Sequence, residues 1–152
     1  MRKFLTLVLS AFLLGVVSLT APAGASERYG KEKVVYHINY NGGDGGKAYK
    51  AALGNIQNHI NAVGAKNLDL KVVLHGNGVY LLRDTVKNLQ LQGTVSNLKR
   101  QNVAFAACKN TLTGRKINAE KDLFEVFDDD IVPSGVAELA RLQGMGYTYI
   151  KP

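Results

Sequence analysis

The sequence is poor in cysteine, because Cys108 is the only one among its 152 residues. A single cysteine cannot form a disulfide bond within the chain. It also cannot supply the several thiolates of a structural zinc site or an iron–sulfur cluster. The thiol is therefore a buried passive group, a covalent link to another chain, or a reactive group.

The chain also lacks a continuous block of like charge, although its formal net charge is +7. Its neighbouring basic residues fall in three separate segments: Lys47 and Lys50, Lys99 and Arg100, and Arg115 and Lys116. The cations are not interleaved with a ladder of aromatic residues of the kind that stacks on single-stranded nucleic acids. We therefore expect a solvated basic surface and no nucleic-acid partner, while an anionic ligand or partner is compatible with the charge.

Two patterns that would bind a nucleotide or a cation are incomplete. Residues Gly43–Ala48 match the letters G-x-G-x-x-A, but the second predicted strand ends at 75–76 without the acidic residue that holds a ribose. A phosphate-binding P-loop fails as well, because Ala48 follows Lys47 where a serine or threonine is required. The acidic run 128–130 lacks the spaced oxygen ligands of a cation loop. The sequence therefore predicts no cofactor and no metal site.

The first 25 residues have the pattern of a cleavable signal peptide. Arg2 and Lys3 precede an apolar run from Phe4 to Leu19, and small residues follow up to Ala25. The run is short for a membrane span of about 20 residues, and the small residues fit the A-x-A rule with cleavage after Ala25. We therefore expect a periplasmic or secreted protein without a permanent membrane anchor.

Removal of residues 1–25 would leave 127 residues with a formal net charge of +5. This length suits one domain with a single core. We expect residues 26–32 to form a flexible N-terminal tail and residues 33–152 to form the domain.

Strand and helix patterns alternate along the domain. Runs rich in β-branched and aromatic residues predict strands at 33–40, 69–76, 103–107, 131–133 and 147–151. Apolar stripes predict helices at 47–63, 79–87, 91–100, 108–113 and 134–143, with a further turn or two at 119–124. In the helix at 134–143, the predicted apolar face contains Val136, Leu139, Ala140 and Gln143. The alternation predicts a three-layer α/β/α fold of the Rossmann or flavodoxin kind, with a mostly parallel five-stranded sheet.

The carboxyl ends of parallel strands meet at one edge of a sheet, where ligands bind in such folds. Four strand-to-helix junctions, at 39–46, 75–78, 108–110 and 133–135, should meet there. Cys108 is the candidate catalytic residue, since backbone N–H groups at a helix start favour a thiolate. The candidate pocket-lining residues are Asn41, His75, Asn77, Lys109, Asn110 and Ser134. The remaining histidines, His37 and His59, are predicted to be structural.

Three blocks of the sequence resemble the DsrE/DsrF-like family: His75–Gly76, Ala107–Leu112 and Val132–Lys151. The resemblance covers nearly the whole mature region and implies a three-layer α/β/α domain that often forms homotrimers or hexamers. It also implies that Cys108 carries sulfane sulfur as a persulfide and passes it to a thiol-bearing partner. We thus expect an exported sulfur-relay protein with sulfurtransferase-like chemistry. The alternative is a non-catalytic, oligomeric binding module in which Cys108 is merely packed.

Overall fold

The computed structural model describes residues 26–152, so the predicted signal peptide lies outside the described residues. The described chain forms a five-stranded sheet in the order β4-β3-β2-β1-β5, and every neighbouring pair is parallel. The strands are β1 (Glu32–Ile38), β2 (Leu68–Leu74), β3 (Ala104–Cys108), β4 (Ile131–Val132) and β5 (Thr148–Ile150). The predicted strands are therefore confirmed, and the sheet is entirely parallel.

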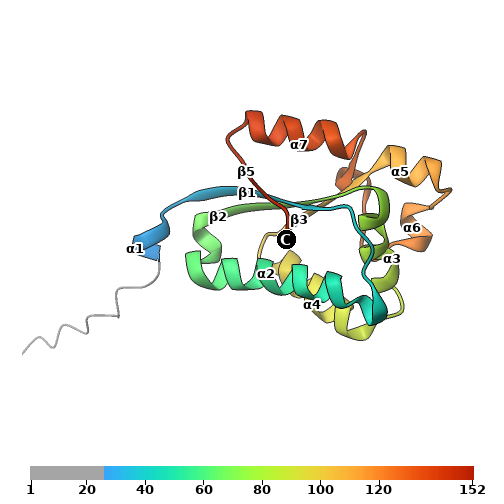
Figure 1. Ribbon diagram of the computed structural model, residues 1–152, viewed down its shortest axis with the longest axis horizontal. Coiled ribbons are helices and arrows are strands. Elements are labelled where there is room, and N and C mark those ends of the chain that lie inside the picture. Colours follow the sequence, from blue (N-terminus) through green and yellow to red (C-terminus); the bar gives the residue numbers. More distant parts are fainter. Residues whose placement is uncertain (1–25) are drawn as a thin grey trace, which may run out of the picture.

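Helices cover both faces of the sheet and crowd its carboxyl edge (Figure 1). They are α1 (Ser26–Tyr29), α2 (Lys47–Val63), α3 (Tyr80–Thr85), α4 (Leu89–Arg100), α5 (Lys109–Gly114), α6 (Ala119–Asp122) and α7 (Gly135–Gly144). Short 3₁₀ turns occupy Asp44–Gly46, Ala65–Asn67, Gly76–Val79 and Asp128–Asp130. The arrangement is the predicted three-layer α/β/α fold.

The larger core lies on one face of the sheet, against α2 and α4. Side chains alternate along a strand, so Val34, Tyr36 and Ile38 of β1 all point to this side. Phe105 of β3 and Ile56 of α2 are buried in the same cluster. We call this side the α2/α4 face.

The opposite face carries a smaller core under α7, which we call the α7 face. Val35 and Val73, from the alternate positions of β1 and β2, pack there with Leu139, Leu142 and Tyr147. The helix α7 is the one drawn above the sheet in Figure 1. Because side chains alternate along a strand, His37 of β1 and Cys108 of β3 lie on this side as well.

The N-terminal end of the described chain is partly helical. The segment expected to be a tail, 26–32, contains the helical turn α1, and its last residue begins β1. Among residues 26–152, the helices are all too short or too polar to cross a membrane.

Candidate thiol site

Cys108 is the last residue of β3 and the residue that precedes the first turn of α5. Its residue surface is only 4% exposed, so the sulfur lies within the protein surface rather than on it. The neutral side chain makes no capping hydrogen bond to α5. Its position at the carboxyl edge of the sheet is the one that the sequence predicts.

Several hydrogen-bond donors surround the sulfur. Burial by itself raises the pKa of the Cys108 thiol, but hydrogen bonding from the Thr111 hydroxyl lowers it. The backbone N–H groups of Gly135, Thr111 and Asn110 lower it further, and the pKa lies below its ordinary value as a result. These donors stabilise the charged form of the sulfur, and their combined effect on the pKa exceeds that of burial.

Gly135 brings His75 and Cys108 together. A Cβ atom at position 135 would lie 2.8 Å from the Cβ of His75 and 3.3 Å from the Cβ of Cys108. Only glycine allows this approach, so the start of α7 reaches the ends of both β2 and β3. The predicted junctions after β2 and β3 therefore meet at the start of α7, where His75 and Cys108 lie on either side of the Gly135 backbone.

His75 belongs to a chain of hydrogen bonds that the sequence does not predict. Its Nε2 lies 2.7 Å from Nε2 of His37, and Nδ1 of His37 lies 2.6 Å from the hydroxyl of Tyr149. The centroids of the two imidazole rings are 4.7 Å apart and their planes differ by 23°, so the rings meet edge to edge through these nitrogens. The sequence predicts a structural role for His37, but the structure places it in contact with a candidate site residue. Period-two alternation is the available signal, because His37 shares a face with Val35.

A second polar contact fixes the turn that follows β2. The guanidinium of Arg115 donates from Nη2 to Oδ1 of Asn77 at 2.7 Å and lies 4.7 Å from the ring centroid of Tyr80. The N–H of Gly76 donates to Oγ1 of Thr111 at 3.0 Å. The side-chain oxygen of Asn77 is thus engaged by Arg115, and the turn is attached to α5 beside the thiol.

The other predicted residues make no observed side-chain hydrogen bond to the sulfur of Cys108. Ser134 caps α7, since its Oγ accepts from the N–H of Ala137 at 3.4 Å. Lys109 and Asn110 form the exposed first turn of α5, and Asn110 donates its backbone N–H to the carbonyl of Pro133. Asn41 is exposed in the loop after β1.

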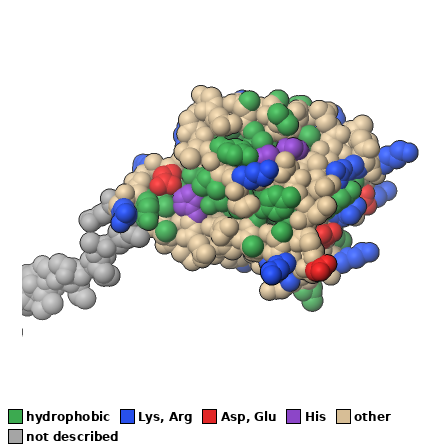
Figure 2. Space-filling model, in the orientation of Figure 1, with side chains coloured by type: hydrophobic (Ala, Val, Ile, Leu, Met, Phe, Trp, Pro, Cys, Tyr) green, Lys and Arg blue, Asp and Glu red, His purple; other side chains and the backbone are tan. Residues whose placement is uncertain are grey.

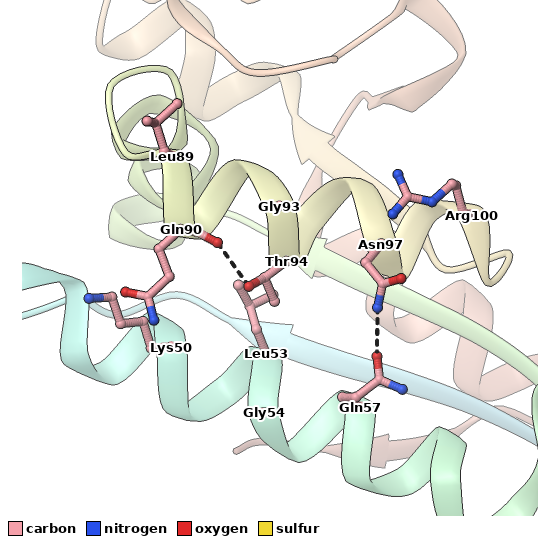
Figure 3. Close-up of a pocket in the computed structure, with 10 residues that line it drawn as sticks. All are labelled: Lys50, Leu53, Gly54, Gln57, Leu89, Gln90, Gly93, Thr94, Asn97 and Arg100. Atoms are coloured by element: carbon pink, nitrogen blue, oxygen red, sulfur yellow. Dashed lines mark hydrogen bonds between the residues drawn. The ribbon is translucent and has the colours of Figure 1, made fainter.

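Two large hollows lie on the surface of the described residues, and neither is lined by Cys108. One, of about 700 Å³, lies between α2 and α4 on the α2/α4 face, where Asn97 and Gln57 point toward each other (Figure 3). The other, of about 630 Å³, lies beside α5 and is lined in part by Lys109 and Pro133, the neighbours of the thiol site. The second hollow therefore adjoins the first turn of α5, which follows Cys108.

The comparisons with known proteins agree with this fold. The family described as DsrE/DsrF-like matches residues 33–152. The chain belongs to the DsrE/DsrF-like family. A solved structure, "Structure of Protein of Unknown Function MTH1491 from Methanobacterium thermoautotrophicum", is similar to it with a TM-score of 0.67 and 32% sequence identity, covering 80% of this chain and 100% of that chain. No curated protein matches the chain. Membership of the DsrE/DsrF-like family suggests a role of the sulfur-relay type.

Metal ligands do not gather around the thiol of this DsrE/DsrF-like domain. Within residues 26–152, no group of three or more His, Cys, Asp or Glu side chains is placed to hold a metal ion.

The hydroxyl of Thr111 is expected to control the thiolate of this DsrE/DsrF-like site. The Thr111→Val variant removes a donor to the sulfur and the acceptor of the Gly76 N–H, so the pKa of Cys108 should rise. A hydrogen bond to a charged group contributes about 1.5 kcal/mol or more. We therefore expect alkylation of Cys108 by iodoacetamide at pH 7 to slow about tenfold.

The Thr111→Ser control keeps the hydroxyl and should react at nearly the native rate. Equal slowing in both variants would show that the hydroxyl does not stabilise the thiolate.

Proposed function

We propose that this protein carries sulfane sulfur as a persulfide on Cys108 and passes it to a thiol of a partner protein. The placement of the thiol carries the proposal: Cys108 ends β3 at the carboxyl edge of the sheet, beside His75 and the start of α7, where the Thr111 hydroxyl and backbone N–H groups of α5 and α7 lower its pKa. A carrier thiol has to be a nucleophile when it takes sulfur and a good leaving group when it gives sulfur up, and a lowered pKa favours the second requirement at neutral pH.

The proposed cycle has two displacements. The Cys108 thiolate attacks the outer sulfur of a persulfide donor, R–S–SH, and the S–S bond of the donor breaks with its electron pair on RS⁻. Cys108 then holds the transferred sulfur as –S–SH. An acceptor thiolate attacks that outer sulfur, and the Cys108 thiolate leaves. Each step exchanges one S–S bond for another, so no external oxidant or reductant is needed.

The proposal includes the export and assembly that the sequence predicts. We expect the signal peptide to be cleaved after Ala25, so that the carrier works in the periplasm or outside the cell. We also expect a homo-oligomer, a trimer or a hexamer. Two apolar side chains are available for such contacts, because Val136 of α7 is 64% exposed and Met145, just after α7, is 50% exposed.

Intact-mass analysis tests the carrier directly. The protein is treated with an inorganic polysulfide under anaerobic conditions, freed of excess reagent and weighed. The native chain should gain the mass of one sulfur atom, and a reductant should remove it. The Cys108→Ser variant should gain nothing, because it has no other cysteine. Absence of the adduct on the native protein, or an equal adduct on the variant, would refute the proposal.

The exposure of Cys108 favours a second candidate, the binding module with a packed thiol. At 4% exposure, the sulfur has few routes to a large reagent. Labelling of the native and the urea-unfolded protein with a small alkylating agent separates the two candidates. A carrier should be labelled in the native state faster than an ordinary thiol at pH 7, whereas a packed thiol should react only after unfolding.

A further inference from the structure

We infer that Tyr149, His37 and His75 form a proton relay that connects the thiol site with solvent at the edge of the sheet. Under this inference, His75 exchanges a proton with the sulfur compound bound beside Cys108. His37 and Tyr149 act through His75 and do not contact that compound. The inference rests on the proposed function and deepens it, since it names the groups that balance the proton during sulfur transfer.

The strand order creates the relay. Tyr149 lies on β5, His37 on β1 and His75 just after β2, and these three strands are consecutive neighbours in the sheet. Tyr149 pairs with Val35, which lies two residues before His37 in β1. His37 pairs with Val73, which lies two residues before His75. Each polar side chain is therefore two residues further along its strand than the previous one, on the same face of the sheet. The three side chains thus form a diagonal line across the α7 face toward the carboxyl edge, where Cys108 lies.

The short distances require alternating donors and acceptors. An Nε2–Nε2 separation of 2.7 Å fits one shared proton, because two N–H groups would repel and two bare nitrogens would have nothing to share. In one arrangement, Tyr149 donates to His37 and His37 donates to His75, which leaves a proton on Nδ1 of His75. In the other, all donors reverse, and Nδ1 of His75 is bare. Changing from one arrangement to the other moves a proton along the line without placing a net charge in the protein.

The environment keeps both imidazoles neutral, as such a relay requires. Burial, the neighbouring His75 and the charge of Lys151 lower the pKa of His37 to about 4. Burial and Lys151 also lower the pKa of His75. Both rings are therefore neutral at pH 7, and each has one N–H and one bare nitrogen.

Both ends of the line are open to a partner. Tyr149 is 39% exposed on the edge strand β5. At the other end, no group among residues 26–152 hydrogen-bonds to Nδ1 of His75, and that nitrogen is not among the buried polar atoms that lack a partner. Histidine side chains reach the surface in two places, one of them between hydrophobic side chains and a Lys or Arg side chain (Figure 2).

The proton balance of the loading step defines the role of the relay. After Cys108 takes the outer sulfur, the leaving group RS⁻ receives the proton from Nδ1 of His75. Nε2 of His75 then takes the proton of His37, Nδ1 of His37 takes the hydroxyl proton of Tyr149, and Tyr149 recovers a proton from a buffer acid or water. The product is RSH, and the donors and acceptors along the line are now reversed. They return to the first arrangement when Nδ1 of His75 takes a proton from the next thiol.

A matched pair of variants tests the relay. Tyr149→Phe removes the outer end of the line, and Tyr36→Phe is its control, because Tyr36 hydrogen-bonds to Nδ1 of His59 at 3.0 Å on the α2/α4 face. We expect Tyr149→Phe to slow sulfur loading from a small organic persulfide at pH 7 by at least about tenfold, since proton transfer contributes effects of that size or larger. Added imidazole should restore the rate by supplying the missing proton. Tyr36→Phe should load at the native rate and show no dependence on imidazole.

The outcomes separate the relay from the carrier function. If the native protein loads sulfur, and Tyr149→Phe either loads equally fast or stays slow at every imidazole concentration, the relay is wrong while the carrier function stands. If the native protein does not load sulfur, the carrier function is wrong. The relay is then judged by ¹⁵N chemical shifts at pH 7, where a cationic His37 or His75 would overturn it and two neutral rings with a shared Nε2 proton would support it.

Discussion

The Gly78→Ala variant is expected to lose about 3 kcal/mol of its free energy of unfolding. A Cβ atom at position 78 would lie 1.9 Å from the carbonyl oxygen of Ile38 and 2.5 Å from its carbonyl carbon. These are backbone atoms of a central strand, so no rotamer change can relieve the clash. The turn Gly76–Val79 would have to move away from β1, and it carries the backbone that follows His75.

Thermal unfolding followed by circular dichroism measures this loss. For a domain of this size, it corresponds to a fall in Tm of about 10 °C. Gly93→Ala is the matched control, because Gly93 lies in α4 and a Cβ there would meet nothing within 4 Å. Alanine inside a helix is more stable than glycine by about 0.5–1 kcal/mol, so the control should gain stability. A Gly78→Ala protein as stable as the native one would show that β1 and this turn are not in contact.

The Gly135→Ala variant is expected to disable the thiol site. Its Cβ would lie 2.8 Å from the Cβ of His75, an atom fixed to the backbone that follows β2. The start of α7 must then shift outward, and the Gly135 N–H that lowers the pKa of Cys108 shifts with it. Overpacking of this kind costs about 1–3 kcal/mol. The pKa of Cys108 should rise, and sulfur loading at pH 7 should fall at least about tenfold, because one of the hydrogen bonds to the charged sulfur is lost.

The reactivity of Cys108 has to be compared between variants that are both folded. Gly54→Ala is the control, because Gly54 lies in α2, away from the α7 face, and a Cβ atom there would meet nothing within 4 Å. It should leave the alkylation rate of Cys108 unchanged. Measurement at a temperature where both variants are fully folded isolates the local effect. A native pH profile of alkylation in Gly135→Ala would mean that α7 does not help to stabilise the thiolate.

Much of the fold follows from local patterns in the sequence. The helix predicted at 47–63 has those bounds, and the strand predicted at 33–40 is observed two residues shorter at its end. The helix has a strong apolar period and ends at Gly64, and the strand is rich in β-branched and aromatic residues. The position of Cys108 between β3 and α5 is also predictable, because an apolar run gives way there to polar residues.

The apolar face of α7 shows where local patterns fail. The sequence predicts that Val136, Leu139, Ala140 and Gln143 face the core, but the buried residues are Gly135, Leu139 and Leu142. Val136 is 64% exposed instead. The reason is that the buried stripe begins at a glycine, whose close approach to His75 and Cys108 sets the rotation of the helix. A pattern of apolar residues does not identify a buried glycine, so it does not predict this rotation of the helix.

The hydrogen-bonded line of Tyr149, His37 and His75 could not be predicted from single segments either. It depends on β5 lying next to β1 and on the register between them. Strand alternation places His37 on one face of β1, but only the strand order supplies its neighbours. The roles of Thr111 and Arg115 are similar, since both act across segments that are 35 or more residues apart along the chain.

The recessed position of Cys108 also decides which sulfur compounds can reach it. A disulfide requires two sulfur atoms about 2 Å apart, and the 4% exposure of Cys108 hinders the approach of the sulfur of a second copy. A covalent dimer is therefore disfavoured even where the surroundings are oxidising. Under the proposed carrier function, the 4% exposure of Cys108 restricts access to slender compounds with the reactive sulfur at the tip, and the depth of the thiol then also limits cross-linking.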